Sequence, residues 1–288
     1  MEKIWTVLEI LHWGEDYFRK HSILSPRLTM ELLLCDILDC KRIDLYLNYD
    51  RPLRSEELDK LHNYIVLRTK SVPLQYIFGK MQFYGLELFI DQRALIPRQE
   101  TEQLVKIAIE FLEDSNFNPI QILDIGTGSG CIAISIAYHF KDTTRKCYID
   151  AIDNSVDSLE LAKENAQKYN LNNIEFHLLD ILKGNISLEK YNCIVSNPPY
   201  IPLKNYNLLD KQIREYEPQS SLTDFSDGLT FYKRYKELIE TMQTGAMMIL
   251  EIDGSNTNDL LEIFKNNNCK IEIFKDLAGI DRIMTLKK

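Results

Sequence analysis

Several features that would assign this 288-residue chain to a specialised class are missing from its sequence. The six cysteines form no C-x-x-C pair and no cluster with histidine, which supports neither a zinc site nor a disulfide scaffold. No run of 18 apolar residues is present to span a membrane. Acidic residues interrupt the apolar N-terminus, unlike a signal peptide. Repeats and low-complexity segments are also lacking, so we expect a cytoplasmic globular protein without a metal.

An excess of positive charge is missing as well. The chain has 34 Lys and Arg residues against 43 Asp and Glu residues, a net charge of −9, and residues 1–75 contribute 11 basic and 12 acidic side chains. Proteins that follow a nucleic-acid backbone neutralise its phosphates with basic side chains. The charge balance therefore disfavours direct nucleic-acid binding, although it leaves room for a local basic patch.

Residues 1–72 are predicted to form a small helical bundle. Apolar residues recur at helical spacing from Ile4 onward. Ser25 and Ser55 each stand at the start of a further helical pattern and are candidate N-caps. No strand pattern occurs in this part of the chain, so we interpret it as a separate helical domain.

Residues 73–97 are predicted to be a β-hairpin connector. Two short β-like runs, residues 75–78 and 86–90, are separated by Gly79 and Gly85, and such runs around glycines are typical of a hairpin.

Residues 98–288 alternate strand-like and helical patterns after a first predicted helix at 100–113. Strands are expected at 120–125, 148–153, 174–179, 191–196, 246–252, 271–274 and 282–286. Helices are expected between them at 131–140, 156–169, 229–242 and 258–267. Short buried strands alternating with helices predict an α/β fold whose seven-stranded, mostly parallel sheet is covered on both faces.

A glycine-rich turn follows the first strand of this sheet and consists of Gly126, Thr127, Gly128, Ser129 and Gly130. Glycine adopts positive φ and lets a ligand approach bare backbone, and open α/β sheets bind ligands at the carboxyl ends of their strands. The spacing G-x-G-x-G departs from the dinucleotide fingerprint because Cys131 occupies the sixth position, and no P-loop Gly-Lys follows. It favours a nucleoside ligand without a pyrophosphate, such as S-adenosylmethionine; the alternative is a turn without a ligand.

Two acidic residues end the next two strands. Asp153 follows Gly130 by 23 residues and is suited to accept hydrogen bonds from ribose hydroxyls. Its alternative role is to cap the following helix, which Asn154 or Ser155 could equally do. Asp180 ends the third strand and marks either the adenine end of the pocket or a solvated turn.

The motif Asn197-Pro198-Pro199-Tyr200 follows the fourth strand. Consecutive prolines fix φ and cannot continue a strand, so the Asn197 side chain and the Pro198 carbonyl are held as two acceptors at the edge of the sheet. A planar NH2 group that donates to both is a poor nucleophile, so orientation must supply much of the rate, up to roughly 7–11 kcal/mol. Tyr200 can pack against the substrate plane. The alternative is a strand-terminating turn.

The chain resembles the bacterial release-factor glutamine methyltransferases, the HemK/PrmC family. An NPPY motif after the fourth strand is typical of methyltransferases that act on planar nitrogen. The blocks that narrow the resemblance are SPRLTMELLL, VPLQYIFGKMQFYGLELFID, LIPRQETEQL, YEPQSSL, DGLTFYKR, LEID and DLAGIDR. The resemblance covers nearly the whole chain. It implies a class I S-adenosylmethionine-dependent methyltransferase fold (Rossmann-like) with a small N-terminal helical domain.

The resemblance also implies a reaction and a site. The family methylates the side-chain amide of the glutamine in the Gly-Gly-Gln motif of peptide-chain release factors, which the N-terminal helices would help to bind. The implied catalytic residues are Asn197, Pro198, Pro199 and Tyr200. The implied residues for S-adenosylmethionine are Gly126, Thr127, Gly128, Ser129, Gly130, Asp153, Asp180, Ile181 and Asn197. Glu100 and Glu102 belong to a block that lies beside the active site in the family.

Two positions depart from the family pattern. Gln99 stands where the family usually has proline, which can loosen the turn into the next helix. Ile181 stands where many members have an aromatic residue against adenine, so a stacking role is in doubt there.

Three alternatives to this function stay open at the level of sequence. They are a glutamine methyltransferase of a ribosomal protein, an adenine-N6 methyltransferase of nucleic acid, and a non-catalytic S-adenosylmethionine-binding adaptor of release factors. The near-neutral helical domain offers no basic stripe for nucleic acid, and an adaptor has no use for the NPPY motif. We expect a monomer that binds no membrane. Glu251, near the end of a buried strand, is expected to have a structural role rather than to face the pocket.

Overall fold

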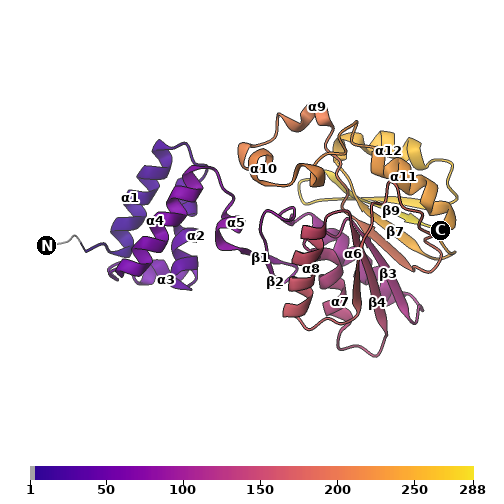
Figure 1. Ribbon diagram of the computed structural model, residues 1–288, viewed down its shortest axis with the longest axis horizontal. Helices are drawn as coiled ribbons and strands as arrows, with labels where there is room; N and C mark the ends of the chain where they lie inside the picture. The colour runs from indigo at the N-terminus through magenta and orange to yellow at the C-terminus, as the bar shows by residue number, and fades with distance from the viewer. Residues whose placement is uncertain (1–3) are drawn as a thin grey trace. The chain divides into compact units, whose positions relative to one another are not determined.

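The computed structural model describes residues 4–288, and the chain divides into two compact units (Figure 1). The first unit runs to Gly79 and also includes Lys211–Tyr216, whereas the second consists of Lys80–Asp210 and Glu217–Lys288. The first three residues of the predicted helical domain lie outside the described residues. Among the helices of residues 4–288, none is long and apolar enough to cross a membrane.

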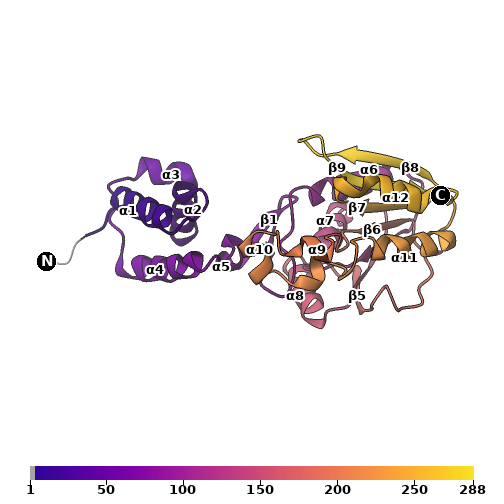
Figure 2. The ribbon, with the colours of Figure 1, turned by 90° about the horizontal axis from the view of Figure 1, so that it is seen from above.

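The first unit is helical, as predicted. Its helices are α1 (Val7–Lys20), α2 (Pro26–Leu38), α3 (Arg42–Leu47), α4 (Ser55–Thr69), α5 (Leu74–Phe78) and α10 (Lys211–Tyr216). Figure 2 shows α4 alongside the group formed by α1, α2 and α3. Leu11 and Phe18 of α1 pack with Met30 and Leu33 of α2 and Leu61 of α4 in one buried core.

Of the predicted helix starts, the one at Ser25 is confirmed in position, whereas those at Ile4 and Ser55 need correction. Ser25 precedes α2 in a left-handed conformation, and its side chain makes no capping hydrogen bond. Arg54 precedes α4, and its backbone N–H donates to the Glu57 side chain at 2.9 Å, so Ser55 is already inside the helix. Ile4 lies before α1, which begins after Thr6.

The hairpin is shifted from the predicted residues. Residues 75–78 belong to helix α5, because Pro73 is suited to a helix start and Gly79, with φ of +69°, ends the helix in a left-handed conformation. The antiparallel strands are β1 (Lys80–Phe83) and β2 (Leu86–Phe89). The prediction of a strand at 75–78 is therefore wrong, whereas that at 86–90 is confirmed.

The second unit contains the predicted seven-stranded sheet. Its strands are β3 (Ile120–Ile125), β4 (Cys147–Asp153), β5 (Ile174–Leu178), β6 (Cys193–Ser196), β7 (Met247–Glu251), β8 (Lys270–Lys275) and β9 (Asp281–Lys287). Their order is β5-β4-β3-β6-β7-β9-β8, and β9 runs antiparallel to both neighbours. The α/β class I methyltransferase fold is thereby confirmed. The strands β4 and β6 flank β3 on opposite sides, so the order in which the chain adds strands to the sheet reverses at β3. Open α/β sheets have a crevice at such a point, at the carboxyl ends of the strands.

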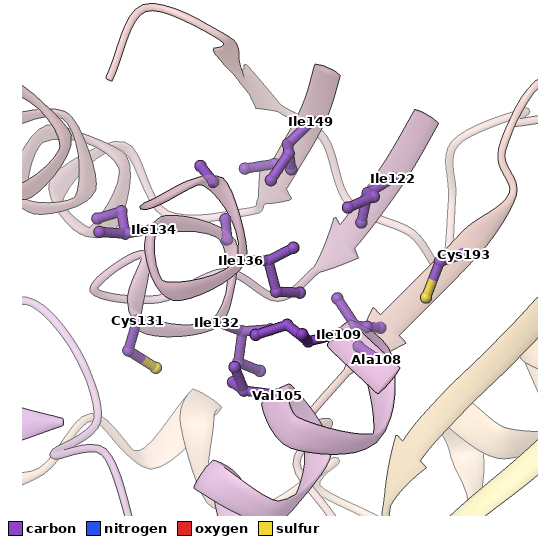
Figure 3. Packing of buried hydrophobic residues seen from close by; sticks show 14 of the residues in the cluster. Val105, Ala108, Ile109, Ile122, Cys131, Ile132, Ile134, Ile136, Ile149 and Cys193 are labelled. Atoms are coloured by element: carbon purple, nitrogen blue, oxygen red, sulfur yellow. The ribbon is translucent and has the colours of Figure 1, made fainter. Parts of the chain in front are cut away.

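Helices cover both faces of this sheet. On one face lie α6 (Thr101–Asp114), α7 (Cys131–Phe140) and α8 (Val156–Lys168), whose apolar side chains share a core with Ile122 of β3. Figure 3 shows Val105 and Ile109 of α6 close to Ile132 of α7. On the other face lie α11 (Thr230–Leu238) and α12 (Thr257–Phe264), which share a core with Leu123. Short helical segments complete the unit: α9 (Leu203–Tyr206), η1 (Gln219–Ser221), η2 (Ile239–Thr241) and η3 (Gly254–Asn256).

Candidate active site

A cleft lies at the carboxyl ends of β3, β4 and β6. Its lining includes Gly126 and Gly128 after β3, Asp153 at the end of β4, and Asn197 and Pro198 after β6. The space within the cleft and its open mouth together is about 770 Å³. The structure thus brings part of the glycine turn, the strand-end acid and the first three residues of the NPPY motif to one cavity. Four predicted site residues are not among its lining: Thr127, Ser129, Gly130 and Tyr200.

The glycine turn contains three residues with positive φ but only part of it faces the cleft. Gly126, Gly128 and Gly130 have φ of +73°, +56° and +81°. A Cβ built on Gly126 would meet no atom within 4 Å, so its backbone borders open space. A Cβ on Gly130 would lie 2.8 Å from Ile134 Cδ1 and 3.1 Å from Ala162 Cβ. Gly130 therefore allows α7 to pack against α8.

Thr127 and Ser129 are buried within the turn. The Thr127 hydroxyl donates to Asp124 Oδ2 at 2.7 Å, and the backbone N–H of Ala133 donates to the same oxygen at 3.3 Å. Asp124 is fully buried, and desolvation raises the pKa of its carboxyl to about 7. These contacts hold the turn against the start of α7.

Asp153 connects the turn to the end of β4. Its Oδ2 accepts from the backbone N–H of Gly128 and its Oδ1 from that of Ser155, both at 2.9 Å. Ser155 is the N-cap of α8, because its side chain accepts from the N–H of Ser158 at 3.2 Å. Burial raises the pKa of Asp153. Each carboxylate oxygen keeps a further lone pair, so the group can still accept from a ligand hydroxyl.

Asp180 and Ile181 line the cleft beyond the end of β5. The Asp180 carboxylate accepts from Lys183 Nζ at 2.8 Å, and this hydrogen bond lowers the pKa of Asp180. Ile181 is buried, and Leu179 lines the same region of the cleft. This region therefore offers an apolar wall with one carboxylate beside it.

The lining also contains residues that the sequence patterns did not predict, among them Arg93, Ser220, Ser221, Phe231 and Tyr235. Ser220, Ser221 and Phe231 belong to the blocks YEPQSSL and DGLTFYKR, which carried the family resemblance but suggested no role by themselves. Phe231 and Tyr235 give the cleft aromatic side chains. No sequence pattern within these segments indicates that they line the same cleft as the glycine turn.

Asn197 is linked to two residues of other elements. Its Nδ2 donates to Thr101 Oγ1 at 3.2 Å, and the Thr101 hydroxyl donates to Glu251 Oε2 at 2.6 Å. The Tyr200 hydroxyl donates to the other oxygen of Glu251 at 3.3 Å. Burial raises the pKa of Glu251 to about 7. Nothing in the sequence pattern singled out Thr101, and for Glu251 the pattern predicted only a structural role.

The two glutamates of the LIPRQETE block do not share this network. Glu102 accepts from the backbone N–H of Tyr84 at 2.8 Å and thereby supports the turn between β1 and β2. Glu100 is the exposed residue that precedes α6. The block reaches the site through Thr101, which stands between them in the sequence.

A separate group of candidate metal ligands lies among the described residues. Ligand atoms of Asp150, Glu175 and His177 lie within 4.8 Å of one another. Asp150 already accepts from Lys190 Nζ at 2.5 Å and from the Tyr191 hydroxyl at 2.7 Å. These residues are not part of the lining of the cleft, and existing partners occupy Asp150.

Comparison with known proteins gives matches over both units. Residues 9–79 match the PrmC N-terminal domain family, and residues 117–281 match a methyltransferase domain family. The chain is 35% identical over 285 residues to the release factor glutamine methyltransferase of Fusobacterium nucleatum, which covers 98% of this chain and 78% of the relative. Relatives of the same name from Chlorobaculum tepidum and Bacillus subtilis are 32% and 34% identical. The alignment with the Chlorobaculum tepidum relative covers 98% of this chain and 97% of the relative. The alignment with the Bacillus subtilis relative covers 96% of each.

Proposed function

Since this chain belongs to the family of release factor glutamine methyltransferases, we propose that it methylates the glutamine of the Gly-Gly-Gln motif in peptide-chain release factors. The methyl group comes from S-adenosylmethionine and is attached to the side-chain amide nitrogen. The observation that carries the proposal is the NPPY motif at the cleft that Gly126 and Asp153 also line.

The cleft fits S-adenosylmethionine. Gly126 leaves open space where a side chain would stand, and Asp153 has acceptor capacity for the ribose hydroxyls. Ile152, Leu179 and Ile181 offer apolar surface for the adenine. When bound, this cofactor supplies a methyl group on a positively charged sulfur, which is open to attack by a nitrogen lone pair.

The NPPY residues orient the substrate amide. The glutamine NH2 group has two N–H donors, and we assign one to Asn197 Oδ1 and the other to the carbonyl of Pro198. Pro198 and Pro199 restrict the backbone that carries both acceptors. Orientation of this kind can contribute up to roughly 7–11 kcal/mol to the rate of a weak nucleophile. The proton of the amide can leave after the nitrogen has become cationic, so no strong base is required before attack.

We further propose that residues 1–72 recognise the release factor, with 73–97 as a connector and 98–288 as the methyltransferase domain. The match of residues 9–79 to a family domain distinct from the methyltransferase domain supports such a division of labour. The net charge of −9 supports a protein substrate over direct contact with nucleic acid. We propose a monomer that acts in the cytoplasm.

A transfer assay tests the proposed function. The protein is incubated with S-adenosylmethionine labelled in its methyl group and with a recombinant release factor. The expected result is label in the release factor and none in a release factor whose Gly-Gly-Gln glutamine is replaced by alanine. Label in the alanine-substituted factor, in DNA or in a ribosomal protein alone, or no label at all, would contradict the proposal.

A further inference from the structure

We propose that Thr101, held by Glu251, is a positioning residue that determines which end of the Asn197 amide faces the substrate. The inference rests on the proposed role of Asn197 in binding the glutamine amide. An asparagine side chain has an oxygen that accepts and an NH2 group that donates. Only the oxygen can accept a hydrogen bond from the substrate NH2 group. The site can therefore bind the substrate amide only when the Asn197 side chain is rotated so that its oxygen faces the substrate.

The three residues come from three elements that meet at one edge of the sheet. Thr101 is the first residue of α6, Glu251 is the last residue of β7, and Asn197 follows β6, the neighbour of β7. Thr101 and Glu251 are each 1% exposed. α6 is fixed by the buried core on its face of the sheet, which includes Leu104 and Val105. The Thr101 hydroxyl is therefore held on a rigid support.

The direction of the hydrogen bonds follows from the chemistry of the three groups. At pH values above its pKa of about 7, the Glu251 carboxylate is ionised and only accepts, so the single hydroxyl proton of Thr101 is then directed to Glu251 Oε2, at 2.6 Å. The Thr101 oxygen is then left with acceptor capacity alone. Asn197 meets it with Nδ2, at 3.2 Å. The opposite end of the amide, Oδ1, is left for the substrate in the cleft that Asn197 lines.

Glu251 connects the two ends of the NPPY motif. Its Oε2 accepts from Thr101, which contacts Asn197, and its Oε1 accepts from the Tyr200 hydroxyl at 3.3 Å. A buried carboxylate requires such donors, because an unpaired charge is costly away from water. The same group therefore orders the first and the last residue of the motif.

The test compares three substitutions in the full chain. Thr101→Val keeps the shape of the side chain but removes the hydroxyl, whereas Thr101→Ser keeps the hydroxyl. Thr285→Val is the matched control, because Thr285 is a similarly buried threonine, 2% exposed, in β9. For each variant, kcat and KM for the release factor, the Kd of S-adenosylhomocysteine and the melting temperature are measured.

We expect kcat of Thr101→Val to fall by roughly 100-fold, the scale expected when a reacting group is misplaced. KM and the cofactor Kd should change by less than about 3-fold, because the lining of the cleft is retained. Thr101→Ser and Thr285→Val should stay close to wild type. Wild-type kcat in Thr101→Val, or an equal loss in Thr101→Ser, would overturn the inference. So would a loss of cofactor affinity in step with kcat, which indicates a merely structural role.

A second measurement separates this inference from the proposed function, because it needs no substrate. The NMR signal of the Asn197 side-chain NH2 group is assigned by its disappearance in Asn197→Ala. We expect this signal to shift in Thr101→Val and to stay in place in Thr101→Ser and Thr285→Val. If it shifts as expected but the wild type methylates no release factor, the proposed function fails and the positioning by Thr101 stands. An unchanged signal in Thr101→Val overturns the positioning.

Discussion

At the scale of single residues, Asn197 has separate uses for its two polar atoms. Nδ2 donates to Thr101 within the protein, and Oδ1 is assigned to the substrate. The residues that we propose for cofactor binding, among them Gly126, Asp153 and Ile181, are other members of the lining of the cleft. Substrate orientation and cofactor binding should therefore be separable by mutation.

We predict that Asn197→Ala lowers the rate of methyl transfer by at least about 100-fold, the scale found when one preorganised hydrogen-bonding group is removed from an active site. The Kd of S-adenosylhomocysteine, measured by calorimetry, should change by less than about 3-fold. A parallel loss of cofactor affinity would mean that Asn197 acts mainly on the cofactor.

Local motifs at this scale could be predicted from the sequence, but their partners could not. The NPPY motif is recognisable because its four residues are adjacent and two of them are prolines. Thr101 lies 96 positions from Asn197 and 150 from Glu251. Only the packing of α6 over β6 and β7 brings these three side chains together, and no sequence spacing encodes that contact.

At the scale of elements, the glycine turn and the β1–β2 turn form a natural comparison. Gly126 and Gly85 have φ of +73° and +77°, and a Cβ on either would meet no atom within 4 Å. Replacement by alanine therefore imposes the same backbone strain at both positions. The difference is that Gly126 lines the cleft and Gly85 lies between β1 and β2.

We predict that Gly126→Ala and Gly85→Ala each lower the free energy of unfolding by about 1–2 kcal/mol, the cost of a left-handed conformation for an L-residue. Only Gly126→Ala should weaken the binding of S-adenosylhomocysteine, by roughly 10-fold or more, because its methyl group enters the cleft. Calorimetric titration of both variants checks this. Equal affinities for the two variants would show that the cofactor does not approach Gly126.

Helices and strands could be predicted from the sequence where the spacing of apolar residues indicates one kind of element. The buried strand runs and the alternation of strands and helices give the correct sheet, because apolar periodicity reflects burial. Residues 75–78 were misassigned because a short apolar run does not distinguish a strand from a helical turn. The sequence motif marks position 130 as a glycine. The reason that a larger residue does not fit there, the close approach of Ala162 in α8, depends on packing and is not visible in the sequence.

At the scale of the whole molecule, the two units have separate cores, and a charged cluster lies within the helical one. Glu57 is 5% exposed and accepts hydrogen bonds from Arg51 at 2.8 Å and from Arg54 at 2.7 Å. The hydrogen bond from Arg51 is the main cause that lowers the pKa of Glu57 to about 2. Both tryptophans, Trp5 and Trp13, belong to the same unit, so tryptophan fluorescence reports its unfolding.

We predict that Glu57→Gln destabilises the helical unit by about 2 kcal/mol at pH 7, a figure reduced for the solvent exposure of the arginines. A lowered pKa means that the stabilisation is complete above the unfolded-state pKa of 4.5 and is lost as the pH falls toward 2. Urea unfolding followed by tryptophan fluorescence should therefore show a smaller difference from wild type at pH 3 than at pH 7. An equal difference at both values contradicts the assigned charge interaction.

The same substitution should leave the cofactor Kd unchanged, because the residues lining the cleft all belong to the second unit. A change in cofactor affinity in Glu57→Gln would show that the two units are energetically coupled.

The central claim concerns one nitrogen atom of one protein, and tandem mass spectrometry of the release factor after reaction tests it most directly. Digestion yields the peptide that contains the Gly-Gly-Gln motif, and its fragment ions locate the added methyl group. The proposal predicts one methyl group on the side-chain amide of that glutamine, which forms with the wild type and forms at least about 100-fold more slowly with Asn197→Ala. A methyl group on any other residue, or an unmodified peptide from an enzyme that binds S-adenosylmethionine, would contradict it.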